Sequence, residues 1–145
     1  MGVLSAFLHP VEVDETKKVI ISKRFLDEDG NPVPFEIKPM TQEENQRLTK
    51  KFTKGKYVNG NKVDVFDSKA YTNAMIVACT VQPDFADSEI CKAYGVVDPE
   101  AVPARMLRAG EYTALVQEIM QFNGFDPDSK LKEEEEAKNL STVTT

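Results

Sequence analysis

The sequence is poor in the side chains that build metal and disulfide sites. Its 145 residues include two cysteines and one histidine. Cys79 and Cys91 lie in apolar surroundings, and His9 stands directly before a proline. Because structural zinc sites use four Cys or His ligands at short, regular spacings, these three residues exclude the usual zinc motifs. We expect no metal and interpret the cysteines as reduced thiols packed among apolar side chains, with a disulfide between them as the open alternative.

Catalytic and cofactor-binding motifs are missing as well. The chain has no glycine-rich loop to cradle a phosphate, and its serines lack the flanking glycines of a nucleophile elbow. Its acidic pairs are explained by turns and helix caps. Lys23 and Arg24, beside Phe25, could hold a phosphate or a carboxylate, although an outward strand face explains them equally well. We therefore expect neither an enzyme nor a bound cofactor.

Basic residues are outnumbered by acidic ones. The chain has 18 Lys and Arg against 24 Asp and Glu, which gives a formal net charge of −6. A nucleic-acid-binding protein needs a basic face to replace the counterions on phosphates, so we expect no nucleic acid partner. One basic region stands out, and we interpret it as a solvated face. It contains Lys50, Lys51, Lys54, Lys56 and Lys62.

Long apolar runs are absent, and none approaches the roughly 20 residues of a membrane-spanning helix. The opening MGVLSAFLHP has no basic beginning, and its apolar part is too short for a signal peptide. We therefore expect a cytoplasmic protein with no membrane partner. The same segment carries an apolar cluster of Val3, Leu4, Phe7 and Leu8. Residues 1–16 are interpreted as an arm that docks either on its own domain or on a neighbouring copy, which would make a homo-oligomer.

Two hairpins are predicted in the first half of the chain. Residues 17–25 and 33–37 alternate apolar and polar side chains around a turn at residues 27–31. Pro32 and Pro34 predict that the second of these strands lies at a sheet edge. Further on, Asn59-Gly60 within residues 57–65 indicates a second hairpin or a mobile loop.

Capping residues mark the helices of the chain. Thr41, Asp67, Asp87 and Asp98 each stand where a helix begins. The helix after Asp67 is apolar almost all round, which predicts that it is buried as the central core helix.

The strongest helical pattern lies in residues 99–125. Pro103 predicts a single turn first and then a helix from about residue 103 to residue 109. A second helix follows, with Gly110 before it and Gly124 as its left-handed cap. Its apolar residues recur at helical spacing on one face. They are Tyr112, Leu115, Val116, Ile119 and Met120.

Together these elements predict an α+β fold. A β-hairpin or small antiparallel sheet at the N-terminus is followed by a compact bundle of about four to five helices. The length fits one domain, which we place at residues 17–125 after the arm of residues 1–16. Residues 126–145 are highly charged and nearly devoid of large apolar side chains, so they are predicted to form a disordered, flexible acidic tail.

Five stretches, taken in order, resemble the XkdN-like tail assembly chaperones of long-tailed bacteriophages and of prophages in Gram-positive bacteria. No single stretch is as specific as a metal or nucleotide signature, and it is their order and spacing that carry the resemblance. They are LSAFLHP (residues 4–10), ISKRFLDEDGNPVPFEIKPMTQEE (21–44), VQPDF (81–85), ICKAYGVVDPE (90–100) and RMLRAGEYTALVQEIMQFNGF (105–125).

The resemblance implies a non-enzymatic protein that is made in the infected cell and is absent from the mature virion. Such chaperones keep the long, helical tape measure protein soluble until tail tube subunits polymerise around it. An apolar helical groove would suit this task. A small structural tail component retained in the virion is the alternative. The candidate partner-binding residues, for each of which a place in the core is at least as good an explanation, are Met106, Leu107, Tyr112, Leu115, Val116, Ile119 and Met120.

The resemblance also implies a longer form made by ribosomal frameshifting, whose extension would recruit the tail tube protein. Ala137-Lys138-Asn139 could be encoded as GCA AAA AAC, which contains the slippery heptamer A AAA AAC. The amino-acid sequence permits this slip site without showing it. The codons in the gene decide whether the heptamer is present.

Overall fold

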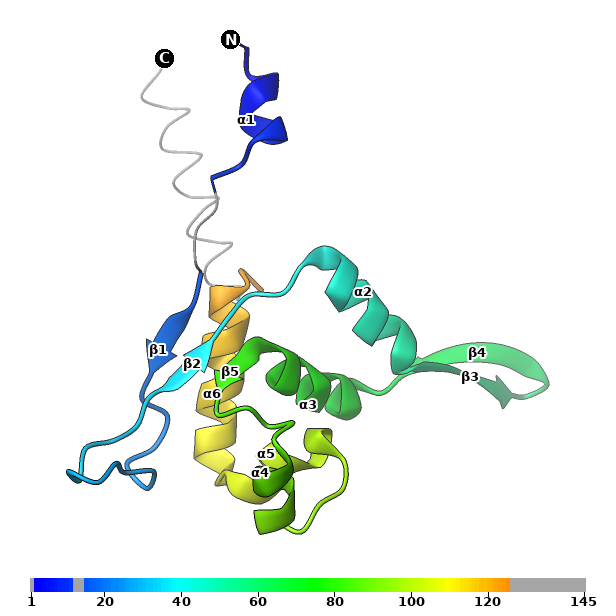
Figure 1. Ribbon diagram of the computed structural model, residues 1–145. Coiled ribbons are helices and arrows are strands. Elements are labelled where there is room, and N and C mark those ends of the chain that lie inside the picture. Colours follow the sequence, from blue (N-terminus) through cyan, green and yellow to red (C-terminus); the bar gives the residue numbers. More distant parts are fainter. Residues whose placement is uncertain (1, 12–14, 126–145) are drawn as a thin grey trace, which may run out of the picture.

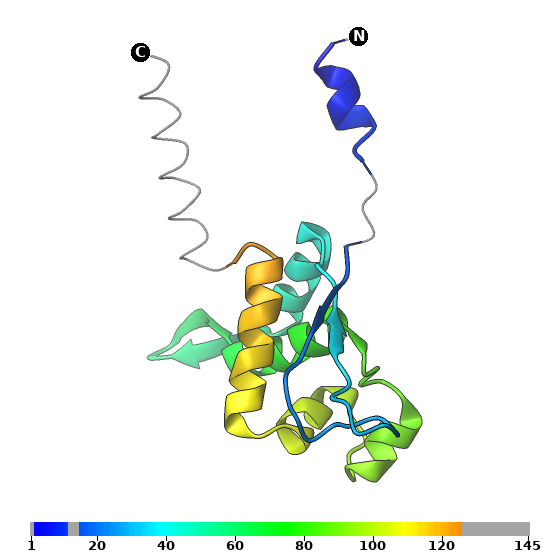
Figure 2. The same cartoon turned by 90° about the vertical axis from the view of Figure 1, so that its left-hand side faces the viewer.

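The computed structural model describes residues 2–11 and 15–125, and it confirms the α+β fold. Three short strands form an antiparallel sheet in the order β1-β2-β5. They are β1 (Lys17–Val19), β2 (Phe35–Ile37) and β5 (Thr80–Gln82). The register places Val19 opposite Phe35 and Ile37 opposite Thr80. The long helix α6 (Ala109–Phe122) runs alongside this sheet in both views (Figures 1 and 2).

The sheet corrects the prediction that its second strand lies at an edge. β2 is the central strand, because β5 pairs with its far side. Pro32 and Pro34 come before the three residues that form the ladder, so their missing N–H groups remove no hydrogen bond from it. The strands are also shorter than predicted. Between them the chain forms an irregular loop, with one bridge between Leu26 and Pro32 and a turn at Gly30, whose φ is +81°.

The second predicted hairpin is confirmed. Helix α2 (Gln42–Lys51) begins where Thr41 Oγ1 accepts a hydrogen bond from the Glu44 N–H (3.1 Å), and it buries no residue. Strands β3 (Thr53–Val58) and β4 (Asn61–Phe66) follow as a separate two-stranded sheet. Asn59 and Gly60 both have positive φ, as the tight turn of a hairpin requires. The hairpin projects away from the body of the molecule (Figure 1).

Helix α3 (Ser68–Cys79) is the central core helix, as predicted. Asp67 caps it by accepting a hydrogen bond from the Ala70 N–H (3.1 Å). Ala74, Met75, Ile76 and Cys79 are buried on it, and it contacts α2, β5, α6 and residues 99–106.

The second half of the chain begins with α4 (Ser88–Ala93), capped by Asp87. A 3₁₀ turn, η1 (Pro99–Ala101), is capped by Asp98 and leads into α5 (Val102–Met106). Two boundaries differ from prediction. α5 ends at Met106 because Leu107 and Arg108 are extended, and α6 begins at Ala109, so Gly110 lies within its first turn. The reason is a cap formed by Glu111, which accepts a hydrogen bond from the Arg108 N–H (2.8 Å).

The core joins the sheet to α3, α4, α5 and α6. Cys79 and Cys91 are both buried free thiols, so the interpretation as packed thiols is confirmed and the disulfide alternative is wrong. Burial raises the pKa of Cys79 to about 11, which keeps its thiol protonated at neutral pH. The buried apolar side chains are Phe35, Ile37, Met75, Ile76, Cys79, Phe85, Cys91, Val102, Leu107, Leu115 and Ile119.

The N-terminal helix α1 (Leu4–Leu8) stands apart from the body in both views (Figures 1 and 2). None of its residues is buried, and Phe7 is 77% exposed. The predicted acidic tail and the proposed frameshift site lie in residues 126–145, outside the described residues.

Candidate partner-binding surface

The seven candidate partner-binding residues all lie on α5, on α6 or at the corner between them. Leu107, Leu115 and Ile119 are buried in the core. The other four are half-buried and pack against that core, so part of each side chain faces outward. These four are Met106, Tyr112, Val116 and Met120. The buried three therefore form a base, and the half-buried four contribute to the surface above it.

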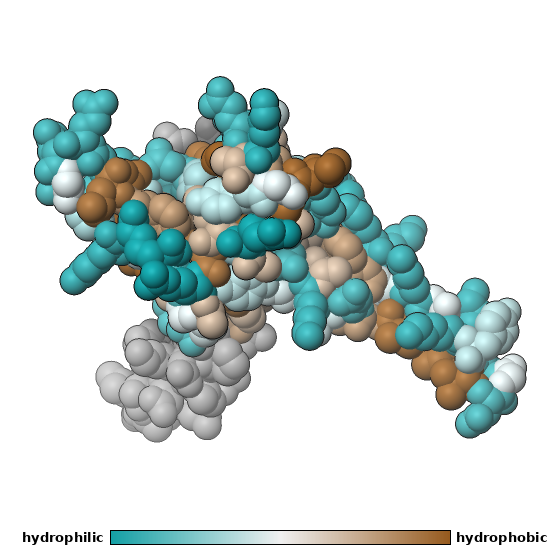
Figure 3. Space-filling model, turned by 90° about the horizontal axis from the view of Figure 1, so that it is seen from below, coloured by the Kyte–Doolittle hydropathy of each residue, from teal (hydrophilic) through white to brown (hydrophobic). Residues whose placement is uncertain are grey.

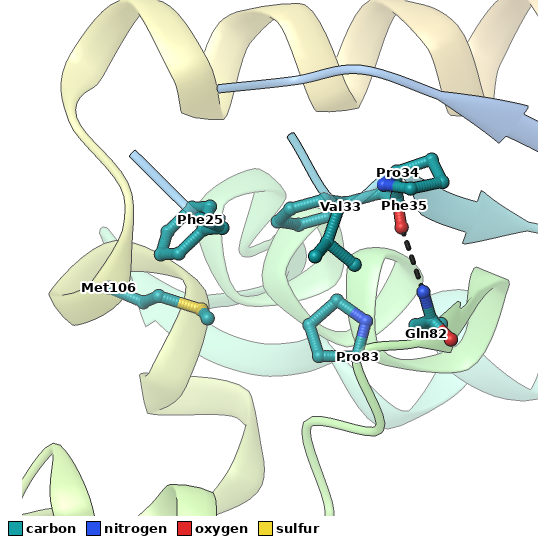
Figure 4. Close-up of a pocket in the computed structure, with 7 residues that line it drawn as sticks. All are labelled: Phe25, Val33, Pro34, Phe35, Gln82, Pro83 and Met106. Atoms are coloured by element: carbon teal, nitrogen blue, oxygen red, sulfur yellow. Dashed lines mark hydrogen bonds between the residues drawn. The ribbon is translucent and has the colours of Figure 1, made fainter. Parts of the chain in front are cut away.

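Met106 faces an apolar hollow of about 110 Å³ between the α5–α6 corner and the sheet (Figure 4). The Nε2 of Gln82 donates a hydrogen bond to the Pro34 carbonyl oxygen (3.0 Å), which satisfies the amide at the rim. A space of this size and lining accommodates one apolar side chain. The other lining residues were not predicted as site residues, because they come from β2, from β5 and from the loops beside these two strands. They are Phe25, Val33, Pro34, Phe35, Gln82 and Pro83.

Leu107 and Tyr112 line a second, more open hollow of about 380 Å³ at the same corner. The hydroxyl of Tyr112 donates a hydrogen bond to Asn73 Oδ1 (2.7 Å) on α3, which fixes the ring while part of it stays at the surface. Burial raises the pKa of Tyr112, so the hydroxyl remains a donor at neutral pH. The remaining lining residues are Ala104, Ala109 and Thr113.

An ion pair fixes the corner that carries both hollows. Arg24 Nε donates to Glu111 Oε2 (3.0 Å), and Arg24 Nη2 donates to the Met106 carbonyl oxygen (3.1 Å). The Arg24 hydrogen bond, followed by those from Ser22 and from the Arg108 N–H, lowers the pKa of Glu111 to about 2. Of the two explanations for Lys23 and Arg24, the structure shows that Arg24 holds a carboxylate, and that the carboxylate belongs to its own chain. The loop before β2 is thereby tied to the start of α6.

The opposite end of α6 is fixed by Asn123. Its Oδ1 accepts a hydrogen bond from the Met40 N–H (2.8 Å), and its Nδ2 donates to the Ile119 carbonyl oxygen (2.9 Å). Both ends of the helix that carries Tyr112, Val116 and Met120 are therefore held against the body. The position of the surface that these residues form is therefore fixed by contacts within the chain itself.

Within residues 2–11 and 15–125 there is no cluster of three or more His, Cys, Asp or Glu side chains that could hold a metal ion. No helix in this part of the chain is long and apolar enough to cross a membrane. The five lysines of the basic region are all exposed, which agrees with a solvated face, and one of them, Lys51, lies 3.4 Å from Glu100 Oε1.

Comparison with known proteins shows which protein family the chain belongs to. Residues 4–138 match the family described as phage XkdN-like tail assembly chaperone protein. The chain therefore belongs to this family of tail assembly chaperones, as its resemblance implied, and membership implies protein partners in tail assembly.

Two relatives from Bacillus subtilis (strain 168) are similar over nearly the whole chain. The phage-like element PBSX protein XkdN is 39% identical over 131 residues, covering 89% of this chain and 87% of its own length. The uncharacterized protein YqbN is 40% identical over the same shares of both chains. The crystal structure of YqbN superposes with a TM-score of 0.72 at 34% identity, covering 87% of this chain and 99% of that one.

Proposed function

We propose that this protein binds the tape measure protein of its phage or prophage in the cytoplasm of the host cell. It would keep that protein soluble until the tail tube polymerises, and it would be absent from the mature virion. Membership of the tail assembly chaperone family supports this proposal. The observation that carries it is the pair of apolar hollows at the α5–α6 corner, which lie at the surface of the domain.

The proposed contact is with an apolar stripe on a helical segment of the tape measure protein. Apolar side chains on one face of such a helix would enter the hollow at Met106 and the hollow at Tyr112. Methionine adapts its shape to different apolar side chains, which suits a repetitive and variable client. Val116 and Met120 would extend the contact along α6, above the base of Leu107, Leu115 and Ile119.

We also propose that the chain consists of an arm, residues 1–16, and a single domain, residues 17–125. The arm presents the exposed side chains of Val3, Leu4, Phe7 and Leu8, which would gain burial against a client or a neighbouring copy. A frameshift-extended form would bring the tail tube protein to the same complex. Reading the gene tests that form, because different codons at residues 137–139 or no overlapping frame would remove the proposed slip site.

Co-expression with the tape measure protein of the same phage or prophage tests the proposal. We expect the tape measure protein to move from the pellet to the soluble fraction and to co-purify with this chain. No gain in solubility and no co-purification would contradict it. Detection of the chain in purified particles by mass spectrometry would instead favour the alternative, a structural tail component.

A matched pair of variants tests the position of the contact. Thr113 is exposed at the rim of the second hollow, so Thr113→Arg places a charge there without touching the core. Gln121, also exposed on α6, lies two turns further along and lines neither hollow. We expect Thr113→Arg to reduce the co-purified tape measure protein several-fold and Gln121→Arg to leave it unchanged, with equal melting temperatures for both. Equal binding by both variants would move the site elsewhere.

A further inference from the structure

The β3–β4 hairpin has two open edges. Every residue from 54 to 66 is exposed, and the hairpin meets the body at its base, where β3 contacts α2 and the Phe66 ring packs against Tyr71 of α3. Figure 3 shows apolar side chains gathered along this projection, between hydrophilic ones. Tyr57 is 79% exposed and Val63 is 44% exposed. An isolated two-stranded hairpin is marginally stable in water, so further pairing would stabilise it.

The contact between Phe52 and Asp67, where the hairpin joins the body, shows which residue pairs of the β3–β4 ladder are hydrogen-bonded. The Asp67 N–H donates to the Phe52 carbonyl oxygen (2.8 Å), at the position where the β3–β4 register pairs these two residues. Hydrogen-bonded pairs recur at every second position of an antiparallel ladder. The pair of Lys56 with Val63 is in the same phase. The backbone N–H and C=O groups of Lys62 and Asp64 therefore point away from β3, toward the open edge of β4.

We propose that β4 pairs with β4 of a second copy of this chain, antiparallel and about a two-fold axis at Val63. In this register Lys62 lies opposite Asp64 of the second copy, and Asp64 lies opposite its Lys62. Both are hydrogen-bonded pairs, as the phase of the hairpin requires. The edge thus offers opposite charges to a copy of itself, and opposite charges directly across a ladder stabilise it.

Charge also disfavours the competing arrangements. A two-fold axis at Asp64 has the same hydrogen-bonding phase but would set two Asp64 carboxylates opposite each other. Pairing through the open edge of β3 would set lysine against lysine, because Lys54 and Lys56 flank Gly55. An axis at Gly55 would place Lys54 opposite Lys56, and an axis at either lysine would place it opposite itself. The edge of β4 is therefore the self-complementary one.

The valines of the hairpin support the same register. Val63 would face Val63 of the second copy as a non-hydrogen-bonded pair, in which the Cα atoms are about 4.5 Å apart and the side chains touch. Val65 and Val58 project from the same side of the sheet as Val63. A four-stranded sheet would then carry one continuous apolar patch in place of two narrow, exposed ones.

The contact is small. Two paired strands bury much less than the roughly 800 Å² per partner of a stable interface, so the dimer is reversible and dependent on concentration. In sedimentation equilibrium the mean mass of the wild-type chain is expected to rise from the monomer value of 16.2 kDa. It should approach twice that value between about 10 µM and about 1 mM. A monomer throughout this range overturns the proposal.

Charge reversal tests the register. Asp64 lies opposite Gly55, and Lys62 opposite Tyr57, so neither has an oppositely charged residue across its own hairpin. Asp64→Lys is expected to weaken association at least about tenfold, since each cross-pair becomes repulsive. The double variant Lys62→Asp with Asp64→Lys restores both cross-pairs with the signs exchanged, and association is expected to recover. Failure of the double variant to recover contradicts the register.

Disulfide trapping tests the axis. Val63→Cys brings two thiols together across the axis, whereas the native thiols of Cys79 and Cys91 are buried. Under mild oxidation we expect this variant to form covalent dimers and the wild-type chain to form none. Val65→Cys is the matched control on the same face, because its two copies would lie about four residue steps, roughly 13 Å, apart along the ladder. Equal trapping of both variants overturns the proposed axis.

Discussion

The α5–α6 corner and the β3–β4 hairpin both present apolar side chains at the surface, but they are supported differently. At the corner, Met106 and Tyr112 rest on a buried layer that includes Leu115. In the hairpin, residues 54–66 are all exposed and have no such layer beneath them. The corner is therefore supported by the core of its own chain, whereas the hairpin would gain burial in the proposed pairing with a second copy.

The two regions should differ most in the free energy of unfolding that is lost when an apolar side chain is truncated. Leu115 is completely buried, so Leu115→Ala is expected to lower the free energy of unfolding by about 3 kcal/mol through lost burial and a residual cavity. Val63 is 44% exposed, and Val63→Ala is expected to cost less than about 1 kcal/mol. Urea unfolding of dilute protein, followed by circular dichroism, measures both. Similar losses would show that the hairpin belongs to the cooperative core.

The Arg24–Glu111 pair makes the stability of the corner depend on pH. The folded-state pKa of Glu111 is about 2, below its ordinary value of 4.5, so the ionised carboxylate stabilises the folded state. This stability is fully present above about pH 4.5 and is lost as the pH falls from there toward 2.

Glu111→Gln is expected to destabilise the protein at pH 7, by less than Leu115→Ala, and to remove the corresponding part of the acid-induced loss. Unfolding midpoints measured between pH 2 and pH 7 check this expectation. Parallel curves for the variant and the wild type would mean that other carboxylates govern the acid response.

The hydroxyl of Tyr112 makes a smaller contribution to the corner. Tyr112→Phe removes its hydrogen bond to Asn73 and leaves the ring in place, which is expected to cost about 1 kcal/mol. Thermal unfolding measures the loss. Tyr57→Phe in the hairpin is the matched control, because Tyr57 is 79% exposed and its hydroxyl faces water, so its effect should be close to zero. Equal effects would place the Tyr112 hydroxyl in solvent.

Local chemistry made much of this fold predictable. Thr41, Asp67 and Asp87 cap helices through hydrogen bonds that reach only two or three residues along the chain. The Asn59-Gly60 turn is equally local. Strand β5 could not be predicted, because three residues directly after α3 become a strand only through pairing with β2, more than 40 residues away. The same pairing moved β2 from the predicted edge to the centre.

The candidate surface could be predicted only in part, because its exposure depends on contacts between distant parts of the sequence. Helical spacing groups Tyr112, Leu115 and Ile119 on one face, but it does not reveal which of them meets another element. The middle of the stripe is covered by the core, and its flank remains at the surface. The ion pair that fixes the corner joins Arg24 to Glu111 across 87 positions of the sequence, and no local pattern indicates such a pair.

A substitution at Gly60, in the turn of the hairpin, is expected to have the smallest effect on global stability. It tests whether the hairpin opens independently of the body. Gly60 has a φ of +79°, which an L-residue adopts at a cost of about 1 kcal/mol. Gly60→Ala should therefore open the hairpin more often, so that the amide of Val63 exchanges with solvent several-fold faster. If the hairpin opens independently of the body, the free energy of global unfolding should change by less than about 0.5 kcal/mol.

Gly110 offers the matched substitution at the corner. It lies in the first turn of α6 with no atom within 4 Å of an added Cβ, and its φ is not positive. Gly110→Ala is expected to stabilise the protein by about 0.5 kcal/mol, because alanine loses less backbone entropy in a helix. Hydrogen exchange and urea unfolding of both variants make the comparison. If Gly60→Ala instead lowers the free energy of global unfolding by its full local cost of about 1 kcal/mol, the hairpin unfolds together with the body and the two regions form one cooperative unit.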